Sequence, residues 1–327
     1  MELGLINLVV SFFLAIAVAP LIIRWLKKLK FGQEILVYVE QHKSKSGTPT
    51  MGGVIILIAS VIGYLIFYRE NNILATISIL TMLSFGILGF LDDFIKIKLK
   101  HNEGLKPYQK VIGQLGISII IAVYIYMSDL VGSEVVVPFT NYTFNLGWGI
   151  VPFVVFFFVA VVNSVNLIDG LDGLCGGVSS VFIFVFAIIL SLLSSSLTGV
   201  YFEEVNNIII VLLGIAGSVL GFLCYNGYPA KVFMGDTGSL ALGGLIATTT
   251  ALTRQYFLVC VIGVLYVLTA LSVIIQVVVF KITKGKRVFK MSPLHHHFEV
   301  TSHEAKVTLI YVMITLIIGV LTIVAYL

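Results

Sequence analysis

The stretch that decides the fold is "VPFVVFFFVAVVNSVNLIDGLDGL", which runs from Val151 to Leu174. It opens with an apolar run that ends at Val161. Four polar residues then follow at intervals of three, namely Asn163, Asn166, Asp169 and Asp172. A helix that faces lipid has no use for polar groups of this kind, because burying them in an apolar medium is costly. The stretch therefore predicts a membrane helix whose end opens into a polar site.

The composition excludes an ordinary soluble domain. Of the 327 residues, 59% are hydrophobic and 11% are charged, and the mean hydropathy is +1.08. Soluble domains average about 25% charged residues, so this chain has too much apolar surface for one soluble core and must use lipid as its solvent. The three cysteines show neither a metal-binding nor a disulfide spacing and are expected to be small buried residues. We expect no nucleic-acid partner.

Windows of about 20 apolar residues, the length that crosses a bilayer, predict ten membrane spans. They cover residues 3–26, 51–68, 73–95, 109–128, 148–165, 174–195, 206–225, 237–253, 256–281 and 306–326. The second and the eighth are short and rich in glycine, and they are the weakest of the ten. We therefore predict an all-α polytopic membrane protein that forms one domain over residues 1–327.

The basic residues orient these spans. If the N-terminus lies outside the cell, 18 of the 20 lysines and arginines fall at inward-facing loops or helix ends, and only Arg69 and Arg254 fall outside. Cytoplasmic loops of membrane proteins carry such an excess of basic residues. Both termini are then extracytoplasmic. All six histidines and five of the six aspartates lie on the cytoplasmic side.

Two further segments are predicted to lie at the membrane surfaces. Ser133–Gly147 is β-branched and aromatic with a polar tip, which predicts a small external β-hairpin. Val277–Lys290 mixes apolar residues with five basic ones, which predicts an amphipathic segment at the cytoplasmic headgroup surface. The ninth span is therefore expected to bend out along this interface.

Aspartates mark two of the inward helix ends. In "DDFIK", Asp92 and Asp93 point about 100° apart on a helix, and Lys96 can pair with Asp92 one turn earlier. In "FMGDTGS" (Phe233–Ser239), Asp236 lies where a helix begins. A helix N-terminus can face an anion, but an aspartate there would repel a phosphate unless Mg²⁺ or Mn²⁺ lay between them. A solvated helix end and a simple helix cap are the competing interpretations.

Three more polar segments fall on the same side. The Asp-Gly steps at Asp169 and Asp172 favour turns that gather amides, carboxylates and backbone N–H groups, and a capped turn is the alternative. "TPTMGG" (Thr48–Gly53) marks a turn before a close-packed helix, although a basic loop would by itself explain Lys45 upstream. "PLHHHF" contains His295–His297, which cannot all face one metal from a regular helix. Histidine can bind phosphate or act as an acid or base near neutrality, and an exposed loop cluster is the alternative.

Five polar segments from separate loops thus fall on one face. They supply carboxylates for a cation, lysines and histidines for phosphates, and amides for a base or a sugar. This combination indicates phosphoryl transfer at the inner membrane surface between a water-soluble nucleotide and a lipid that arrives through the bilayer. Such catalysis works mainly by positioning and by neutralising charge.

These motifs resemble those of the polyprenyl-phosphate N-acetylhexosamine-1-phosphate transferases, in the order "TPTMGG", "DDFIK", "NSVNLIDGLDGL", "FMGDTGS" and "PLHHHF". The first and the last motif favour the bacterial branch that transfers phospho-N-acetylmuramoyl-pentapeptide. The resemblance extends from Lys45 to His297. It implies that undecaprenyl phosphate attacks the β-phosphate of UDP-N-acetylmuramoyl-pentapeptide, with Mg²⁺ required, to give UMP and lipid I at the bacterial cytoplasmic membrane.

The resemblance also implies roles for single residues. Asp236 would be the Mg²⁺ ligand, and Lys96 would steady the phosphates. Asp92 and Asp93 would lie by the lipid phosphate, where one of them acts as a base or helps to hold the metal. Phe233 would stack on uracil. The nucleoside side of the site would be lined by Asn166, Asp169, Asp172 and Asn226. The polar substrate would be contacted by Lys45, Thr50, His296, His297 and His295, the last of which also counts as catalytic.

Several alternatives stay open. Direct attack by the lipid phosphate is favoured over a covalent aspartyl-phosphate path, because a phosphate monoester with a second pKa of about 6 is largely a dianion at neutral pH. A sister branch would transfer N-acetylglucosamine phosphate instead. A secondary transporter would carry its ion site near the midplane, whereas these aspartates lie at predicted cytoplasmic helix ends. The sequence leaves open whether the chain forms a homodimer.

Overall fold

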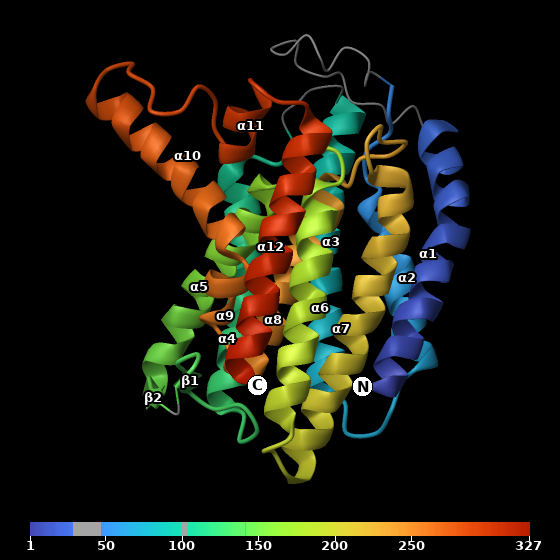
Figure 1. The fold of residues 1–327 in the computed structure, drawn as a ribbon, viewed down its shortest axis with the longest axis vertical. Coiled ribbons are helices and arrows are strands. Elements are labelled where there is room, and N and C mark those ends of the chain that lie inside the picture. The colour runs from blue at the N-terminus through green and yellow to red at the C-terminus, as the bar shows by residue number, and fades with distance from the viewer. Residues whose placement is uncertain (29–46, 100–103, 141) are drawn as a thin grey trace.

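The computed structural model describes residues 1–28, 47–99, 104–140 and 142–327. These form a bundle of helices with one small sheet (Figure 1). Figure 1 places both chain termini and the sheet at one end of the bundle and α11 (Leu294–Glu299) at the opposite end. The predicted substrate contact Lys45 lies outside the described residues.

Eight of the described helices are long and apolar enough to cross a membrane. They are α1 (Glu2–Lys28), α3 (Ile73–Leu99), α4 (Pro107–Met127), α5 (Ile150–Leu167) with the short η2 (Gly147–Gly149) before it, α6 (Leu174–Ser194), α7 (Gly199–Asn226), α10 (Val264–Ile282) and α12 (Glu304–Tyr326). The prediction of a mostly helical protein with several membrane spans is confirmed. The count of ten spans and the direction in which they cross the membrane stay predictions.

The two weakest predicted spans correspond to α2 (Gly53–Ile66) and α8 (Gly235–Leu252). With 14 residues, α2 is short for a full crossing. Every residue of α8 from Thr237 onward is buried, and the helix packs mainly against α3 and α5. The hydroxyls of its last three threonines, Thr248 to Thr250, donate to carbonyls of their own helix, as Thr248 does to Gly244. The sequence of α8 can have a low hydropathy because the helix is surrounded by protein rather than by lipid.

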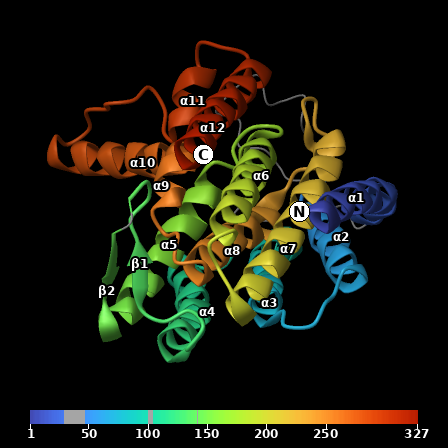
Figure 2. The same ribbon diagram turned by 60° about the horizontal axis from the view of Figure 1, so that its bottom comes forward.

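Within the predicted ninth span, 256–281, the described helix that is long and apolar enough to cross a membrane is Val264–Ile282, so the first part of the prediction is wrong. The chain forms a short helix, α9 (Leu258–Ile262), breaks at Gly263 and continues as α10. Figures 1 and 2 show α10 leaning away from the other helices, so most of its apolar side chains lie at the surface. Of the predicted amphipathic segment, Val277–Ile282 belongs to α10 and the rest forms turns. Its place at a headgroup surface stays a prediction.

The predicted β-hairpin is present. β1 (Glu134–Val136) pairs antiparallel with β2 (Thr143–Asn145), and Val135 lies opposite Phe144. Arg254, just beyond α8, holds this hairpin to the bundle. Its guanidinium Nη1 lies 2.6 Å from the Glu134 carboxylate, and its carbonyl accepts a hydrogen bond from the Val136 N–H.

Glycine allows α1 and α7 to pack with their backbones in contact. A Cβ atom added at Gly217 of α7 would collide with the carbonyl oxygen of Leu8 in α1. By contrast, a Cβ added at Gly116 of α4 would meet no described atom within 4 Å outside the neighbouring turns of its own helix. The two positions therefore separate the cost of a backbone collision from the effect of alanine in a helix.

We expect Gly217→Ala to lower the melting temperature in detergent, because overpacking against a backbone costs about 1–3 kcal/mol. Gly116→Ala is the matched control and is expected to keep or raise it, since alanine is favoured over glycine by about 1 kcal/mol in helices. Equal melting temperatures for the two variants would contradict the close approach of α1 and α7.

Candidate active site

A carboxylate from α3 caps the N-terminus of α8. Asp93 Oδ1 accepts a hydrogen bond from the Asp236 N–H at 3.2 Å, and its Oδ2 accepts from the Thr237 N–H at 2.9 Å and the Thr237 hydroxyl at 2.7 Å. The Asp93 side chain is buried. The free N–H groups and the positive end of a helix both favour a carboxylate at this position. Asp93 thereby fixes Asp236 close to the end of α3.

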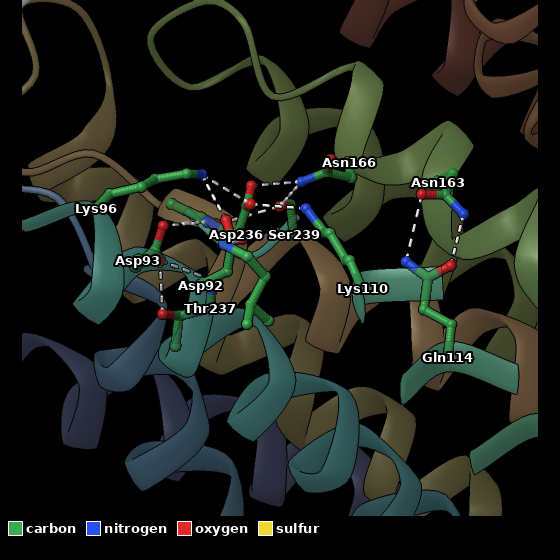
Figure 3. Close-up of polar contacts among 12 residues, drawn as sticks. Asp92, Asp93, Lys96, Lys110, Gln114, Asn163, Asn166, Asp236, Thr237 and Ser239 are labelled. Carbon is green, nitrogen blue, oxygen red and sulfur yellow. Dashed lines mark hydrogen bonds and ion pairs between the residues drawn. The ribbon is translucent and has the colours of Figure 1, made fainter. Parts of the chain in front are cut away.

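Three carboxylates meet at this point. Oxygen atoms of Asp92, Asp93 and Asp236 lie within 4.8 Å of one another. Lys96 Nζ lies 2.6 Å from Asp92 Oδ2 and 3.0 Å from Asp236 Oδ2, and Lys110 Nζ of α4 lies 2.7 Å from the same Asp236 oxygen (Figure 3). Since like charges at such distances repel strongly away from bulk water, the two ammonium groups stabilise the cluster.

The second oxygen of Asp236 faces α5. Asn166 Nδ2 donates to Asp236 Oδ1 at 2.7 Å and also lies 2.8 Å from Ser239 Oγ (Figure 3). Four helices, α3, α4, α5 and α8, therefore contribute side chains to one polar cluster. It lies at the C-terminal ends of α3 and α5 and the N-terminal ends of α4 and α8.

The cluster has the donors that suit a hard divalent cation, since Mg²⁺ takes carboxylate oxygens. Both oxygens of Asp93 accept hydrogen bonds from backbone N–H groups of α8, and these donors are fixed in the helix. The contacts of Asp236 Oδ2 are to flexible lysine side chains, and 16% of the Asp236 side chain is exposed. Asp236 and Asp92 are therefore the residues that could hold such an ion.

The Asp-Gly turn after α5 is tied to the loop before α8. Asp172 accepts a hydrogen bond from the Ala230 N–H at 3.0 Å. Asn226 accepts from the Gly173 N–H at 3.2 Å and donates to the Val232 carbonyl at 3.0 Å. The predicted residues Asp172 and Asn226 thus hold together the two loops that flank Asp236.

Two of the quoted motifs pair through their backbones. The Phe233 N–H donates to the Pro49 carbonyl and the Gly52 N–H to the Phe233 carbonyl, each at 2.8 Å. Between these two bonds, Thr50 is buried beside Gly235. The backbone of Gly235 has a φ of +72°, which glycine adopts without the steric strain that a residue with a side chain would have. Thr50 and Phe233 are therefore held next to the start of α8, with the Phe233 ring partly exposed.

The three histidines do not act as one group. A Cβ atom at Gly170 would collide with the His295 ring, so α11 packs directly on the Asp-Gly turn. His296 Nδ1 lies 2.6 Å from a Glu299 carboxylate oxygen. His297 instead accepts a hydrogen bond from the Lys290 N–H at 3.1 Å. His295 and His296 lie by the turn, whereas His297 is bonded to the preceding segment.

His295 is fully buried, and among the described residues neither of its ring nitrogens has a hydrogen-bond partner. Burial lowers the pKa of His295 to about 3, and the neighbouring His296 contributes to this shift. The ring is therefore neutral at pH 7. In this state His295 can donate or accept a hydrogen bond but does not supply a positive charge to a phosphate.

Asp169 lies in the turn, half-buried. Burial raises the pKa of the Asp169 carboxyl well above its usual range, and the negative charges of Asp236 and Asp93 raise it further. Asp169 therefore lies within electrostatic reach of the carboxylate cluster, one helical turn beyond Asn166. The structure brings the predicted residues into two adjoining groups, one around Asp236 and one around the turn.

Comparison with known proteins identifies this architecture. Residues 74–254 match the model of glycosyl transferase family 4, and residues 45–57 match phospho-N-acetylmuramoyl-pentapeptide-transferase signature 1. The chain is 45% identical over 320 residues to the phospho-N-acetylmuramoyl-pentapeptide-transferase of Clostridium novyi (strain NT), covering 97% of this chain and 95% of the relative. The proteins of the same name from Thermoanaerobacter sp. (strain X514) and Clostridioides difficile (strain 630) are 47% and 42% identical over 94% and 99% of both chains.

The chain belongs to the phospho-N-acetylmuramoyl-pentapeptide-transferase family. The resemblance found in the motifs is confirmed. The signature covers "TPTMGG", and the family-4 match contains the three motifs with the clustered aspartates and asparagines. Membership of this family therefore rests on the same segments that meet at the start of α8.

Two residues of this site were missed by the sequence analysis. Lys110 was counted only as an inward-facing basic residue, and Ser239 only as the end of a motif. A signal for Lys110 existed, since it lies within the first turn of an apolar helix and only 14 residues after Lys96. Two lysines that flank one short connection between membrane helices can reach the same carboxylate.

The position of Asp169 generates a prediction about pH. In the unfolded protein, an aspartate ionises at about pH 3.9. In the folded protein the pKa of Asp169 is raised, so its ionisation is resisted. The free energy of unfolding therefore falls as the pH rises above the pKa of the unfolded state. We expect Asp169→Asn to raise the melting temperature at about pH 7.5 and to leave it unchanged near about pH 4.

The measurement is thermal unfolding in detergent with a chelator present. Asp129→Asn, which changes an exposed carboxyl in another loop, is the control and should move the melting temperature little at either pH. A gain from Asp169→Asn that is larger at the acidic pH than at the alkaline one would contradict the assignment.

Proposed function

We propose that this protein transfers phospho-N-acetylmuramoyl-pentapeptide from its UDP-linked donor to undecaprenyl phosphate, giving UMP and lipid I, a precursor of peptidoglycan, with Mg²⁺ as cofactor. The supporting observation is the cluster of Asp92, Asp93 and Asp236 with Lys96 and Lys110, in a chain of this family. Carboxylates for a divalent cation next to ammonium groups for phosphates suit a reaction between a diphosphate and a phosphate.

We further propose that the site faces the cytoplasm of a bacterium and that α2 and α8 complete ten crossings. The distribution of basic residues supports this orientation. The cluster lies where α3 and α5 end and α8 begins, while the chain termini lie together at the other end of the bundle (Figure 1). A soluble nucleotide would then reach the cluster from water and the lipid phosphate from the bilayer.

The chain's own residues would prepare the reacting groups. Lys96 and Lys110 would neutralise the phosphate oxygens that they reach from α3 and α4, and Asn166 would hold Asp236 in orientation. Mg²⁺, held by Asp236 with Asp92, would supply additional neutralisation of phosphate charge. Asp93 would act mainly through the cap that places α8, since both of its oxygens are engaged there.

We favour direct attack. An oxygen of undecaprenyl phosphate forms a bond to the β-phosphorus of the donor, the bond from that phosphorus to the bridging oxygen breaks, and the bridging oxygen leaves with UMP. The nucleophile is already largely a dianion at neutral pH, because its second pKa is about 6. No side chain then has to remove a proton, and Asp92, paired with Lys96 at 2.6 Å, serves as a charged partner of that lysine.

The second group of residues would bind the nucleoside and sugar. Phe233 is partly exposed and its backbone is held by two hydrogen bonds, so its ring could stack on uracil. Asp169 and His296 lie beside the Asp-Gly turn, where they can meet polar groups of the donor. Asp172 and Asn226 would support this region by joining its two loops. Thr50, buried beside Gly235, and His295, buried against Gly170, would contact the polar substrate.

The first test measures UMP release from UDP-N-acetylmuramoyl-pentapeptide with undecaprenyl phosphate, with and without Mg²⁺. We expect release only with the metal and a loss of more than about 100-fold in kcat for Asp236→Asn. Asp129→Asn is the control and should keep full activity. Turnover of UDP-N-acetylglucosamine in place of the muramoyl donor would assign the sister reaction, and solute uptake by proteoliposomes without UMP release would revive a transporter.

The second test separates a site lysine from an exposed one. Lys110→Met is expected to lower kcat by about 100-fold, because it removes one preorganised positive charge from the site. Lys98→Met removes an exposed lysine from the end of α3 and should change kcat little. Similar losses in the two variants would show that general positive charge at this end of the bundle, rather than the contact with Asp236, is what matters.

A further inference from the structure

Two amide side chains pair between α4 and α5, one helical turn away from the carboxylate cluster. Asn163 Nδ2 donates to Gln114 Oε1 at 2.7 Å, and Gln114 Nε2 donates in return to Asn163 Oδ1 at 3.3 Å (Figure 3). Asn163 also donates to the Val159 carbonyl of its own helix at 2.7 Å. Gln114 is 1% exposed.

Each amide lies one turn from a residue that contacts Asp236. Gln114 is four residues after Lys110 on α4, and Asn163 is three residues before Asn166 on α5, so each pair shares a helix face. Lys110 contacts Asp236 Oδ2, and Asn166 contacts Asp236 Oδ1. The helices α4 and α5 thus each contact a different oxygen of the Asp236 carboxylate. The two amides connect α4 to α5 one helical turn away from these contacts.

The position of α4 depends on α5. Of all the helices, α5 makes the most extensive contact with α4. Within lipid, apolar packing alone gives little resistance to one helix sliding along another. Close packing at small residues and hydrogen bonds between polar side chains carry much of the association of membrane helices. A reciprocal amide pair fixes both distance and register, because a shift by one residue would break both bonds between the amides and leave the buried Gln114 side chain without its partner.

We propose that Gln114 and Asn163 are positioning residues that set α4 against α5 so that the Lys110 ammonium reaches Asp236. The proposal deepens the proposed function by adding residues to the same site. A merely stabilising pair would hold the protein together without preference for Lys110. A positioning pair affects Lys110 on α4 and leaves Lys96 on α3, which contacts the same Asp236 oxygen, in place.

The test measures how fast single lysines of the folded protein are acylated by an amine-specific reagent, with each site quantified by mass spectrometry of the peptides after digestion. In Gln114→Leu, we expect Lys110 to react about fivefold faster, the factor that corresponds to about 1 kcal/mol of lost hydrogen bonding. Lys96 should react at its wild-type rate, and the exposed Lys281 serves as the internal reference. Equal acceleration of Lys96 and Lys110, or of neither, would overturn the proposal.

Two further variants keep the test independent of a general folding defect. Ser118→Ala removes a buried hydroxyl one turn further along α4, whose bond among the described residues is to the main-chain carbonyl of Gln114, and it should leave Lys110 at its wild-type rate. Gln114→Asn shortens the side chain on α4 so that its amide no longer reaches Asn163. Adding Asn163→Gln lengthens the partner side chain on α5 and should restore the slow acylation rate of Lys110. The pair would have only a packing role if the double variant failed to restore the slow rate and Ser118→Ala also accelerated the acylation of Lys110.

Enzyme activity gives a separate readout. In Gln114→Leu we expect kcat to fall about tenfold while KM for the nucleotide donor stays within about twofold, since the predicted nucleoside contacts lie on other loops. Absence of UMP release from the wild-type protein would count against the proposed function alone, because the lysine reactivities do not depend on turnover. An unchanged kcat in Gln114→Leu with an active wild type would overturn the positioning role.

Discussion

The hydrogen bonds from the start of α8 to the Asp93 carboxylate determine where everything else in the site lies. Asp93 comes from the end of one helix and caps the beginning of another, so the sequence-distant motifs "DDFIK" and "FMGDTGS" are joined by three bonds to one side chain. Because the first N–H groups of a helix have no partners inside it, a buried helix start needs such an acceptor. The cap places Asp236 directly beside Asp92, and the lysines and Asn166 then converge on it.

Adjacent aspartates of similar chemistry acquire different roles from their partners. Asp93 is engaged by backbone N–H groups that cannot move, whereas Asp92 is paired with the flexible Lys96 and accepts a hydrogen bond from the Leu105 N–H. Asp236 contacts side chains from three other helices. Three carboxyl groups meet two ammonium groups at a site largely closed to water. Such a site favours a further cation, and flexible lysines can then turn from carboxylate to phosphate.

Much of this could be predicted from the sequence, for physical reasons. The long apolar windows identify helices that face lipid, and the hairpin followed from β-branched and aromatic residues around a polar tip. The limits of sequence reasoning are equally specific. Hydropathy describes contact with lipid, so it gives little weight to α8, which is enclosed by protein, and it does not register the break at Gly263 within an apolar run. Spacing placed Asp92 and Asp93 on one helix but could not show that one of them caps α8.

The site shows the same division. The motifs gathered Asp236, Asn166 and the Asp-Gly turn because each stands out against an apolar background. Lys110 and Gln114 were missed because their partners lie on other helices and no local pattern connects them. The three histidines are adjacent in sequence, yet the short α11 separates His297 from the other two. Contacts between helices are therefore the part that a linear pattern did not provide.

The enclosure of α8 has a consequence for how the protein is made. A segment enters the bilayer from the insertion machinery by partitioning into lipid, and the free energy of that step depends on its own side chains. α8 carries glycines, four threonines and an aspartate in its first turn, so it gains little from lipid by itself. It follows α2, α3 and α5 in the chain, and these helices pack against it, so most of its surroundings are synthesised first. The helix that carries Asp236 is thus one whose entry into the membrane depends on helices that were inserted before it.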